Sequence, residues 1–492
     1  MRLDAINIQS DDMQKTDILF VAPPFSYGYL DPTSPRCPPL GVASIAAVLE
    51  KGGYSVSILD AFSAEMTVEQ VIDEVKRVNP TMLGLTGTTV TFLKALEIMK
   101  AAKEYNPSIV TVYGGPHVTT MPETAIEKPY VDIIAIGEGE YTALELCGSI
   151  IRKKMKLSEI KGIHYRENGK VVKNAPRPFI ENLDELPIPA YHLLPMDRYR
   201  PYAVIDPGYK FVTMVSSRGC PYKCVYCTSS VMFGHRWRQM SVERTVKEIK
   251  YLYDTYGIRH IYFQDDEFTV NQDRTVKICE WIIENKLDLI WECLTRVNLI
   301  KEHTIDMMAK AGCKSIAFGI EQGYEEGLVR VRKQITLDQA KEAIRVTKKC
   351  GILSRASFII GFPWEGAKEI KKTIRFAKEL DADITYINIL NPYPGTAIYD
   401  EIVQKGLLMG NEMNWDRFNS HTAKPWIRTE YLTEKQLAYW SGRAYLELYL
   451  RPKFLIRKIR QTKNMHDLIR NVKGAFSLIG ISLQRLAGKK DF

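Results

Sequence analysis

The chain has 492 residues, of which 45% are hydrophobic and 25% are charged, a composition typical of soluble globular proteins with two or three domains. No apolar run reaches the ~18 residues that a membrane-spanning helix requires. The net charge of +9 is concentrated in residues 451–492, which hold eleven Lys or Arg and two Asp or Glu. The rest of the chain is neutral and carries no recognised nucleic-acid-binding module, so we expect no nucleic acid partner.

Residues 16–150 alternate short apolar runs with segments of helical periodicity. The expected strands are 18–22, 56–60, 82–86, 109–113 and 133–136, and the first expected helix is 40–51. This alternation predicts an α/β fold with a doubly wound, Rossmann-like parallel sheet. Such sheets bind ligands at the carboxyl ends of their strands.

The residues that follow these strands are small, polar or flexible. They are Gly87 and Thr88 after the third strand, Gly114, Gly115 and His117 after the fourth, and Gly137, Glu138 and Gly139 after the fifth. Glycine lets a backbone approach a large ligand closely. Ordinary turns explain each loop equally well, and the dinucleotide pattern GxGxxG is absent, so NAD is not favoured.

A second series of strands and helices begins after a proline-rich stretch, residues 174–205, which reads as a linker over the surface. Its expected strands are 211–215, 260–263, 289–293, 315–318, 357–360 and 384–388, with helices such as 242–256 and 337–350 between them. Six strands with crossover helices suit the partial (β/α)6 barrel of the family that the motifs below resemble. The predicted domains are 1–150, a linker 151–205, a barrel 206–400 and a helical C-terminal region 401–492.

Three cysteines, Cys220, Cys224 and Cys227, follow the first barrel strand in a CxxxCxxC pattern. Iron–sulfur clusters usually have four cysteine ligands, so three ligands leave one iron open to another molecule. The alternative is a structural zinc site, which needs four ligands, usually as two pairs. The chain contains no second CxxC and no CxxH, so we expect a reactive cluster that uses all three cysteines.

The spacing, with Tyr226 before the last cysteine, resembles the radical S-adenosylmethionine (radical SAM) enzymes. The resemblance implies a 4Fe–4S cluster whose open iron binds SAM and whose reduction yields a 5′-deoxyadenosyl radical. It also implies that Tyr226 lies against the adenine.

Further motifs follow later strands in the order that this family shows. Asp265 and Asp266 are expected to bind the SAM ammonium or ribose, although a solvated acidic loop is an equal alternative. Arg296 is expected to bind the SAM carboxylate, because arginine forms a bidentate fork with carboxylates. Glu321, in a segment that resembles GIESG, is expected at the ribose or amine. Gly361 belongs to a segment that resembles the adenine contact.

Residues 16–150 resemble the cobalamin-binding domain that precedes many radical SAM barrels. The resemblance implies cobalamin contacts from the glycine-rich loops that follow the third, fourth and fifth strands. The DxHxxG motif, whose histidine ligates cobalt, is absent. We therefore expect His117 to shape its loop or make an indirect contact rather than bind cobalt.

These resemblances imply a cobalamin-dependent radical SAM enzyme, and a C-methyltransferase acting on an unactivated carbon in particular. The alternative is an oxidative cyclase or other ring-forming enzyme similar to the anaerobic porphyrin ester cyclase; a zinc-stabilised binding protein is a more remote one. Expected partners are a small or hydrophobic substrate and an electron donor such as ferredoxin or flavodoxin.

Two features bear on where the protein acts. The first fifteen residues lack a signal-peptide pattern and the chain has nine cysteines, so we expect a reducing cytoplasm. The basic, partly apolar tail from Arg451 predicts either a helical cap or contact with an anionic membrane surface.

Overall fold

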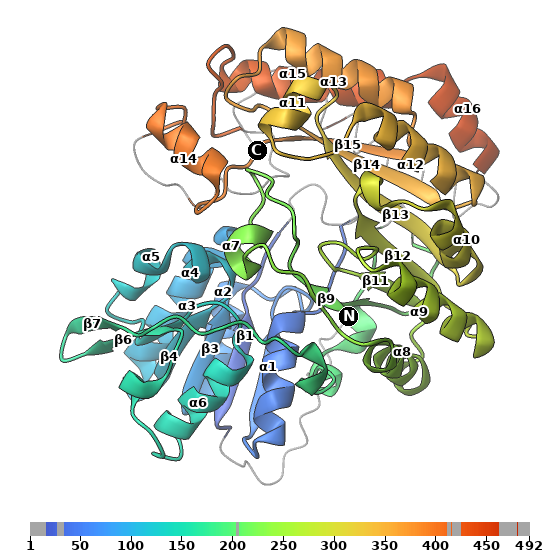
Figure 1. The fold of residues 1–492 in the computed structure, drawn as a ribbon. Helices are drawn as coiled ribbons and strands as arrows, with labels where there is room; N and C mark the ends of the chain where they lie inside the picture. Colours follow the sequence, from blue (N-terminus) through green and yellow to red (C-terminus); the bar gives the residue numbers. More distant parts are fainter. Residues whose placement is uncertain are drawn as a thin grey trace.

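The computed structural model describes residues 16–26, 34–202, 206–410, 415, 425–461 and 480. Two α/β units make up the molecule, an N-terminal one drawn in blue and cyan and a barrel drawn in green to orange (Figure 1). Helix α7 and strand β9 lie between the two units (Figure 1).

The N-terminal sheet has seven strands in the order β2-β1-β3-β4-β5-β6-β7. Its strands are β1 Ile18–Ala22, β2 Val56–Asp60, β3 Met82–Thr86, β4 Val110–Gly114, β5 Ile133–Ala135, β6 Ile163–Glu167 and β7 Lys170–Lys173. The first five pair in parallel, as predicted. Because the strand order reverses between β1 and β3, a ligand site is expected at the carboxyl ends of these strands.

Helices cover both faces of this sheet. They are α1 Leu40–Lys51, α2 Val68–Val78, α3 Phe92–Tyr105, α4 Pro116–Thr120, α5 Pro122–Ile126 and α6 Glu140–Ile150. One buried core contains side chains of α2 and α3, and a second contains side chains of α1 and α6. Val71 and Val75, four residues apart, are the buried residues of α2, which shows how helical periodicity selects the buried face.

The predicted linker, residues 151–205, contributes strands to the N-terminal sheet and side chains to the barrel core. Strands β6 and β7 form an antiparallel hairpin that extends the N-terminal sheet beyond β5. The proline-rich stretch after it does not only run over the surface, because Tyr191 is fully buried and donates a hydrogen bond to Glu248 Oε1 at 2.8 Å. Its hydrophobic side chains join the barrel core, which corrects the prediction of a surface linker.

The second sheet has six parallel strands in the order β15-β14-β13-β12-β11-β8, the partial barrel that was predicted. Its strands are β8 Phe211–Met214, β11 His260–Phe263, β12 Ile290–Thr295, β13 Cys313–Glu321, β14 Leu353–Ile360 and β15 Ile384–Ile389. The associated helices are α8 Val242–Tyr256, α9 Gln272–Glu284, α10 Glu302–Lys310, α11 Glu325–Arg330, α12 Leu337–Lys349 and α13 Ala367–Leu380. A short antiparallel pair, β9 Ser217–Arg218 and β10 Arg238–Gln239, flanks helix α7 Ser229–Phe233.

The C-terminal region forms helices α14 Ala397–Gln404, α15 Glu434–Tyr449 and α16 Pro452–Gln461. Helix α15 packs against β15 and α13. Arg451, Lys453 and Arg457 all form ion pairs with Asp381, so this part of the basic tail is attached to the barrel. The rest of the predicted tail, except Gly480, lies outside the described residues. Within the part of the chain that the structure describes, no helix has the length and hydropathy of a membrane span.

Candidate active site

The cysteine loop begins where β9 ends, and its backbone conformation is tightly constrained. Gly219 has φ +84°, and an added Cβ would collide with the carbonyl oxygen of Arg236. The Val225 amide donates to the Val331 carbonyl at 3.2 Å, which ties the loop to the segment after α11. The loop therefore requires glycine at position 219 and presents its thiols in a defined arrangement.

The three thiols differ in their exposure. Cys224 is buried, whereas Cys220 and Cys227 are half-exposed, and all nine cysteines of the chain are free. Burial raises the pKa of Cys220 to about 12 and that of Cys227 to about 11. In the described ranges, no three His, Cys, Asp or Glu side chains are arranged around a single metal ion. A cluster differs from a single ion, because each thiolate binds its own iron atom and the sulfur atoms need not converge on one point.

Arg296 lies directly beside the cysteine loop. Its side chain is 2% exposed, its Nη1 donates to Cys224 Sγ at 3.6 Å, and its guanidinium lies 3.7 Å from the centre of the Tyr222 ring. Among the described residues, its Nη2 has no hydrogen-bond partner. A buried N–H group without a partner next to the cluster ligands fits the predicted role of holding the SAM carboxylate.

Lys333 is a buried cation that the sequence analysis missed. Its Nζ contacts Glu321 Oε1 at 3.0 Å and the Tyr226 hydroxyl at 3.2 Å. Desolvation is the largest single effect and lowers its pKa, but the charges of Glu321, Cys224 and Glu267 together outweigh it, so the pKa is raised overall. Lys333 thus joins Tyr226 to Glu321, two residues that were predicted to contact SAM.

The backbone around this pair is strained. Glu321 has φ +72° at a register shift between β13 and β14, and the neighbours of Lys333 have φ +52° at Arg332 and +56° at Gln334. Left-handed conformations at non-glycine residues cost of order 1–3 kcal/mol each and often occur where function requires them. No local motif announces Lys333, because it reaches the site through the turn between α11 and α12.

Asp265 and Asp266, in the acidic segment after β11, both accept hydrogen bonds from serine residues near the cysteine motif. Asp265 accepts hydrogen bonds from the Ser216 amide at 2.7 Å, the Ser216 hydroxyl at 2.7 Å and the Ser217 hydroxyl at 2.6 Å. Asp266 is exposed and accepts from the Ser229 hydroxyl at 2.8 Å. Both carboxylate oxygens of Asp265 therefore brace the start of the cysteine loop, and its contact with SAM stays a prediction.

Glu267, the next residue, is a better candidate for a SAM contact. It is 7% exposed, and its Oε2 has no hydrogen-bond partner among the residues described. Burial raises its pKa to about 8, against the opposing charges of Lys333 and Arg296. Sequence reasoning identified this acidic segment but not which of its carboxylates faces the site.

The segment after β14 forms a braced aromatic loop next to Tyr226. Glu365 is fully buried and accepts from the amides of Gly361 at 2.6 Å and Phe362 at 3.0 Å. Phe362 stacks on Trp364 with 5.1 Å between ring centres and meets the Tyr226 ring edge-on at 6.0 Å. Phe362, the neighbour of Gly361 in the chain, therefore brings this loop beside Tyr226, which fits the prediction that both Tyr226 and Gly361 contact the adenine.

The glycine-rich loops of the N-terminal sheet lie at the carboxyl ends of β3, β4 and β5. Gly87 and Thr88 follow β3, Gly114 ends β4 and Gly115 precedes α4. Gly137 has φ +80° with open space where a Cβ would stand, so its backbone is accessible to a ligand. Helix α4 packs against α7, which places these loops next to the helix that follows Cys227.

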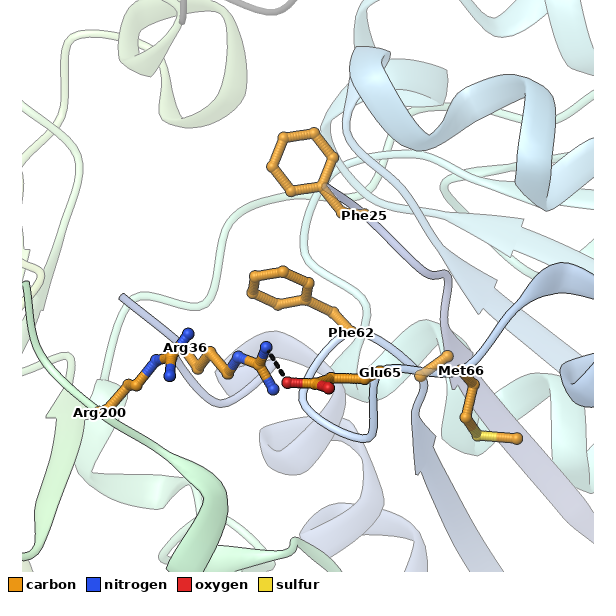
Figure 2. A pocket seen from close by; sticks show the side chains of 7 residues that line it. Phe25, Arg36, Phe62, Glu65, Met66 and Arg200 are labelled. Carbon is orange, nitrogen blue, oxygen red and sulfur yellow. Dashed lines mark ion pairs between the residues drawn. The ribbon is translucent and has the colours of Figure 1, made fainter. Parts of the chain in front are cut away.

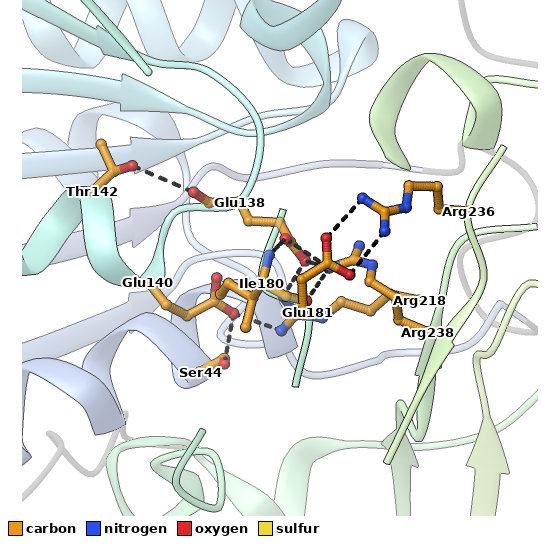
Figure 3. A network of polar contacts seen from close by, with 9 residues as sticks. All are labelled: Ser44, Glu138, Glu140, Thr142, Ile180, Glu181, Arg218, Arg236 and Arg238. Atoms are coloured by element: carbon orange, nitrogen blue, oxygen red, sulfur yellow. Dashed lines mark hydrogen bonds and ion pairs between the residues drawn. The ribbon is translucent and has the colours of Figure 1, made fainter. Parts of the chain in front are cut away.

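Two residues predicted at this edge are engaged elsewhere. Glu138 is buried and accepts hydrogen bonds from Arg218 and Arg238 of the barrel unit, and Gly139 packs against Ile45. Figure 3 shows Glu138 pointing toward these arginines. The carboxylate of Glu138 is thus a link between the two units and points toward the barrel.

His117 is fully buried in the N-terminal unit. Its Nδ1 lies 3.3 Å from the Thr89 hydroxyl and its Nε2 lies 3.0 Å from the Thr124 hydroxyl. Its ring packs on Phe92 at 4.0 Å and on Trp415 at 4.8 Å between centres. Both ring nitrogens therefore have protein partners, which fits the expected role of His117 in shaping its loop.

A hollow of about 430 Å³ lies beside the ends of β1 and β2 (Figure 2). Phe25, Phe62 and Met66 line one part of it, and Arg36, Glu65 and Arg200 line another, with an ion pair between Arg36 and Glu65. It is a mixed apolar and charged space at the carboxyl end of the N-terminal sheet.

The inner face of the barrel carries a second polar group, deeper than the SAM candidates. Glu292 contacts His260 Nε2 at 2.9 Å and forms an ion pair with Arg355 Nη2 at 2.8 Å. In the described part of the chain, Arg355 Nε, His260 Nδ1 and the Ser315 hydroxyl lack hydrogen-bond partners. These buried polar groups lie on strands whose alternate residues, such as Ala317 and Ser357, are half-exposed inside the barrel.

Two family models match the chain. The B12 binding domain matches residues 29–147 and the radical SAM superfamily matches residues 214–377, each inside the corresponding predicted domain. An uncharacterized methyltransferase of Pyrococcus horikoshii is 39% identical over 91% of this chain and 95% of its own length. The chain belongs to the cobalamin-binding radical SAM enzymes. Its cofactors are a 4Fe–4S cluster, SAM and cobalamin, as the cysteine motif and the N-terminal fold predicted.

Two further similarities are informative. The anaerobic magnesium-protoporphyrin IX monomethyl ester cyclase of Rubrivivax gelatinosus is 31% identical over 79% of this chain and 70% of its own length. The solved structure of the radical enzyme OxsB with aqua-cobalamin bound is 18% identical and covers 96% of this chain and 72% of its own, with a TM-score of 0.73. The structural likeness confirms the predicted fold class, in which a Rossmann-like unit precedes a radical SAM barrel.

Proposed function

We propose that this radical SAM enzyme is a C-methyltransferase that methylates an unactivated carbon of a small molecule. The observation that carries the proposal is the meeting of the two candidate cofactor sites. Helix α4, which begins just after Gly115, packs against α7, which begins just after Cys227. Gly395 lies between the two, since a Cβ there would contact Val231 of α7 and Thr120 of α4.

This arrangement suits a reaction that needs both cofactors at one carbon atom. When bound, SAM at the reduced cluster supplies hydrogen abstraction, and methylcobalamin supplies the methyl group. Cys220, Cys224 and Cys227 hold the cluster in this proposal. The unpartnered Nη2 of Arg296 binds the SAM carboxylate.

The remaining SAM contacts divide by chemistry. Glu321 and Glu267 present carboxylate oxygens to the SAM ammonium or ribose, and Lys333 holds Glu321 in place at 3.0 Å. Tyr226 and the loop from Gly361 provide the aromatic and backbone surface for adenine. For cobalamin, the proposed contacts are the exposed Thr88, the partly exposed backbones of Gly114, Gly115 and Gly137, and the adjacent buried Gly87.

The substrate enters the barrel in this proposal, where Arg355 and Ser315 offer unpartnered polar atoms. These groups favour a substrate with at least one hydrogen-bonding group. In this proposal the substrate group contacts residues near the starts of β13 and β14, whereas SAM contacts residues at the strand ends. A substrate that is hydrophobic elsewhere is compatible with the half-exposed Ala317 and Ile359 on the same face.

Two further parts of the proposal concern partners. A small electron carrier, such as ferredoxin or flavodoxin, reduces the cluster in the cytoplasm. Leu450, Leu455 and Ile456 are 45–50% exposed beside Lys453, which is 75% exposed, and this basic apolar face supports peripheral contact with an anionic membrane. Sedimentation with anionic liposomes at low salt tests the contact, and a protein that stays in the supernatant contradicts it.

Mass analysis of products from methyl-labelled SAM tests the central proposal. The reconstituted, anaerobic enzyme is incubated with reductant, cobalamin and candidate substrates. A methyltransferase forms S-adenosylhomocysteine together with 5′-deoxyadenosine and a labelled product. Formation of 5′-deoxyadenosine with an unlabelled, ring-closed product instead supports the cyclase alternative, which the relative from Rubrivivax gelatinosus represents.

A further inference from the structure

A buried network of charges joins the N-terminal unit to the strand that precedes the cysteine loop. Figure 3 shows the carboxylates of Glu138 and Glu140 on one side and the guanidinium groups of Arg218 and Arg238 on the other. The side chains of Glu138 and Glu140 are each 4% exposed, and those of Arg218 and Arg238 are 14% and 5% exposed. The network is therefore shielded from solvent. Salt screens buried ion pairs much less than exposed ones.

The guanidinium group of Arg218 contacts both carboxylates with its two terminal nitrogens. Nη1 donates to Glu138 Oε1 at 2.7 Å, and Nη2 donates to Glu140 Oε1 at 2.6 Å. Glu140 also accepts from the Ser44 hydroxyl of α1 at 2.9 Å. Because Arg218 is followed directly by Gly219 and Cys220, this fork fixes the origin of the cysteine loop relative to the N-terminal sheet.

Glu138 has a second role in the same network. Arg218 and Arg238 are directly opposite one another in the β9–β10 pair, so their side chains share one face. Like charges in this position repel, and the carboxylate of Glu138 lies between them, accepting from Arg238 Nη1 at 2.8 and 3.0 Å. The amide of Ile180 also donates to Glu138, at 2.7 Å. Removal of this one carboxylate would set two buried cations against each other beside the cysteine loop.

The loop of residues 137–140, which carries Glu138 and Glu140, also faces the proposed cobalamin site. Gly137, adjacent to Glu138, has open space at its Cβ position, and its amide donates to the Thr119 hydroxyl of α4 at 3.1 Å. Residues 137–140 therefore present an accessible backbone to the proposed cobalamin site and two carboxylates to the barrel. One short loop contacts both cofactor regions.

We propose that Glu138, Glu140 and Arg218 are positioning residues that set the placement of the cluster relative to the cobalamin. The inference rests on the proposed two-cofactor function and deepens it, since methyl transfer requires both cofactors to reach one carbon atom. The four charges balance, so the network holds its geometry without a net buried charge.

Three variants and a matched control test the proposal. Glu138→Gln removes the central carboxylate. The double variant R218Q/E140Q removes one charge of each sign and leaves the Glu138–Arg238 pair balanced, so it remains informative if Glu138→Gln fails to fold. Arg218→Lys keeps the charge but loses the fork. The control is R236Q/E181Q, an exposed ion pair between the loop before β10 and the stretch after β7, with both side chains about 60% exposed.

The first measurement needs no cofactor. Hydrogen exchange of the backbone amides of residues 217–228 is compared in the metal-free proteins. We expect at least tenfold faster exchange in Glu138→Gln and R218Q/E140Q, an intermediate increase in Arg218→Lys, and wild-type exchange in the control. This measurement remains valid if the chain turns out to transfer no methyl group.

The second measurement is the dipolar interaction between the reduced cluster and cob(II)alamin, both of which are paramagnetic, in proteins loaded with both cofactors. We expect one narrow distance distribution in the wild type and the control, and a broader or shifted one in the network variants. Wild-type exchange together with a wild-type distance in R218Q/E140Q, at full iron and cobalt content, would overturn the proposal. So would reduced cobalamin content in Glu138→Gln with unchanged exchange, because Glu138 would then act on cobalamin directly. A wild-type protein that binds no cobalamin refutes the proposed function, whereas the exchange measurement still tests the link.

Discussion

The burial of His117 predicts a specific dependence of stability on pH. Desolvation lowers the pKa of His117 from 6.5 to about 4, because the ring is enclosed by Phe92 and Trp415 and bonded to two neutral hydroxyls. Above pH 6.5 the imidazole is neutral in both the folded and the unfolded state. As the pH falls from 6.5 toward 4, the unfolded state takes up a proton first, so the folded state loses stability until both states are protonated.

The pKa of His117 is lowered by about 2.5 units on folding. The folded state therefore loses about 3 kcal/mol of stability once both states are protonated, and about 2 kcal/mol of this is already lost at pH 5. Replacement of His117 by Gln removes this dependence, because glutamine does not titrate. The same change removes the ring contact with Phe92, which we expect to cost about 1–2 kcal/mol at pH 8. The wild type should therefore be more stable than His117→Gln at pH 8, and the difference should vanish or reverse near pH 5.

Hydrogen exchange of the β4 amides, corrected for intrinsic rates, measures the local free energy of opening in both proteins between pH 5 and 8. His192→Gln, at an exposed histidine, serves as the control and should track the wild type. If the difference in the free energy of opening between the wild type and His117→Gln stays constant with pH, the reasoning is refuted. Nitrogen hyperfine lines on cob(II)alamin that disappear in His117→Gln would also refute it, because His117 would then bind cobalt.

Four further predictions concern the barrel. Cys224→Ala should lose the 4Fe–4S cluster, read as iron content and visible absorption, whereas alanine at the buried Cys293 should retain it. Lys333→Met should raise the KM for SAM at least tenfold in 5′-deoxyadenosine assays and leave iron content unchanged, and a wild-type KM would contradict its role. Glu365→Ala leaves two buried amides unpaired and should cost about 2–4 kcal/mol of stability, while Glu365→Gln should cost less than half of that in denaturant titrations. Asp265→Asn should impair cluster retention more than SAM affinity; the opposite order would support the predicted contact of Asp265 with SAM.

Patterns that depend on local periodicity were predicted well from the sequence. The strand Ile18–Ala22 and the helix Leu40–Lys51 were placed at their observed ends, because apolar runs and helical spacing report burial directly. The hairpin β6–β7 was missed, since its short strands carry charged residues such as Arg166 and Lys173 on an exposed edge. Edge strands need little hydrophobic alternation, so they resemble a linker in sequence.

Motifs identified the candidate site, but they did not show which side chain of a motif faces it. In the acidic segment after β11, strand alternation and the turn send Asp265 to the Ser216 amide and leave the Glu267 carboxylate without a partner. Lys333 could not be found from local sequence, because a distant turn with two left-handed residues delivers it. Such choices depend on tertiary contacts rather than on spacing along the chain.

Gly137 and Glu138 show that local sequence does not determine the direction of a side chain even for two adjacent residues of one loop. Both were predicted as cobalamin contacts because they follow the same strand, and a glycine-rich turn does favour close approach of a ligand. The direction of Glu138 is decided instead by Arg218 and Arg238, which lie 80 and 100 residues away along the chain. A buried carboxylate needs partners, and besides the two arginines the described residues give it the backbone amide of Ile180, in the stretch after β7. The two guanidinium groups of the barrel therefore determine its orientation. The contact that turns the Glu138 carboxylate toward the barrel also connects the loop of Gly137 to the cysteine loop.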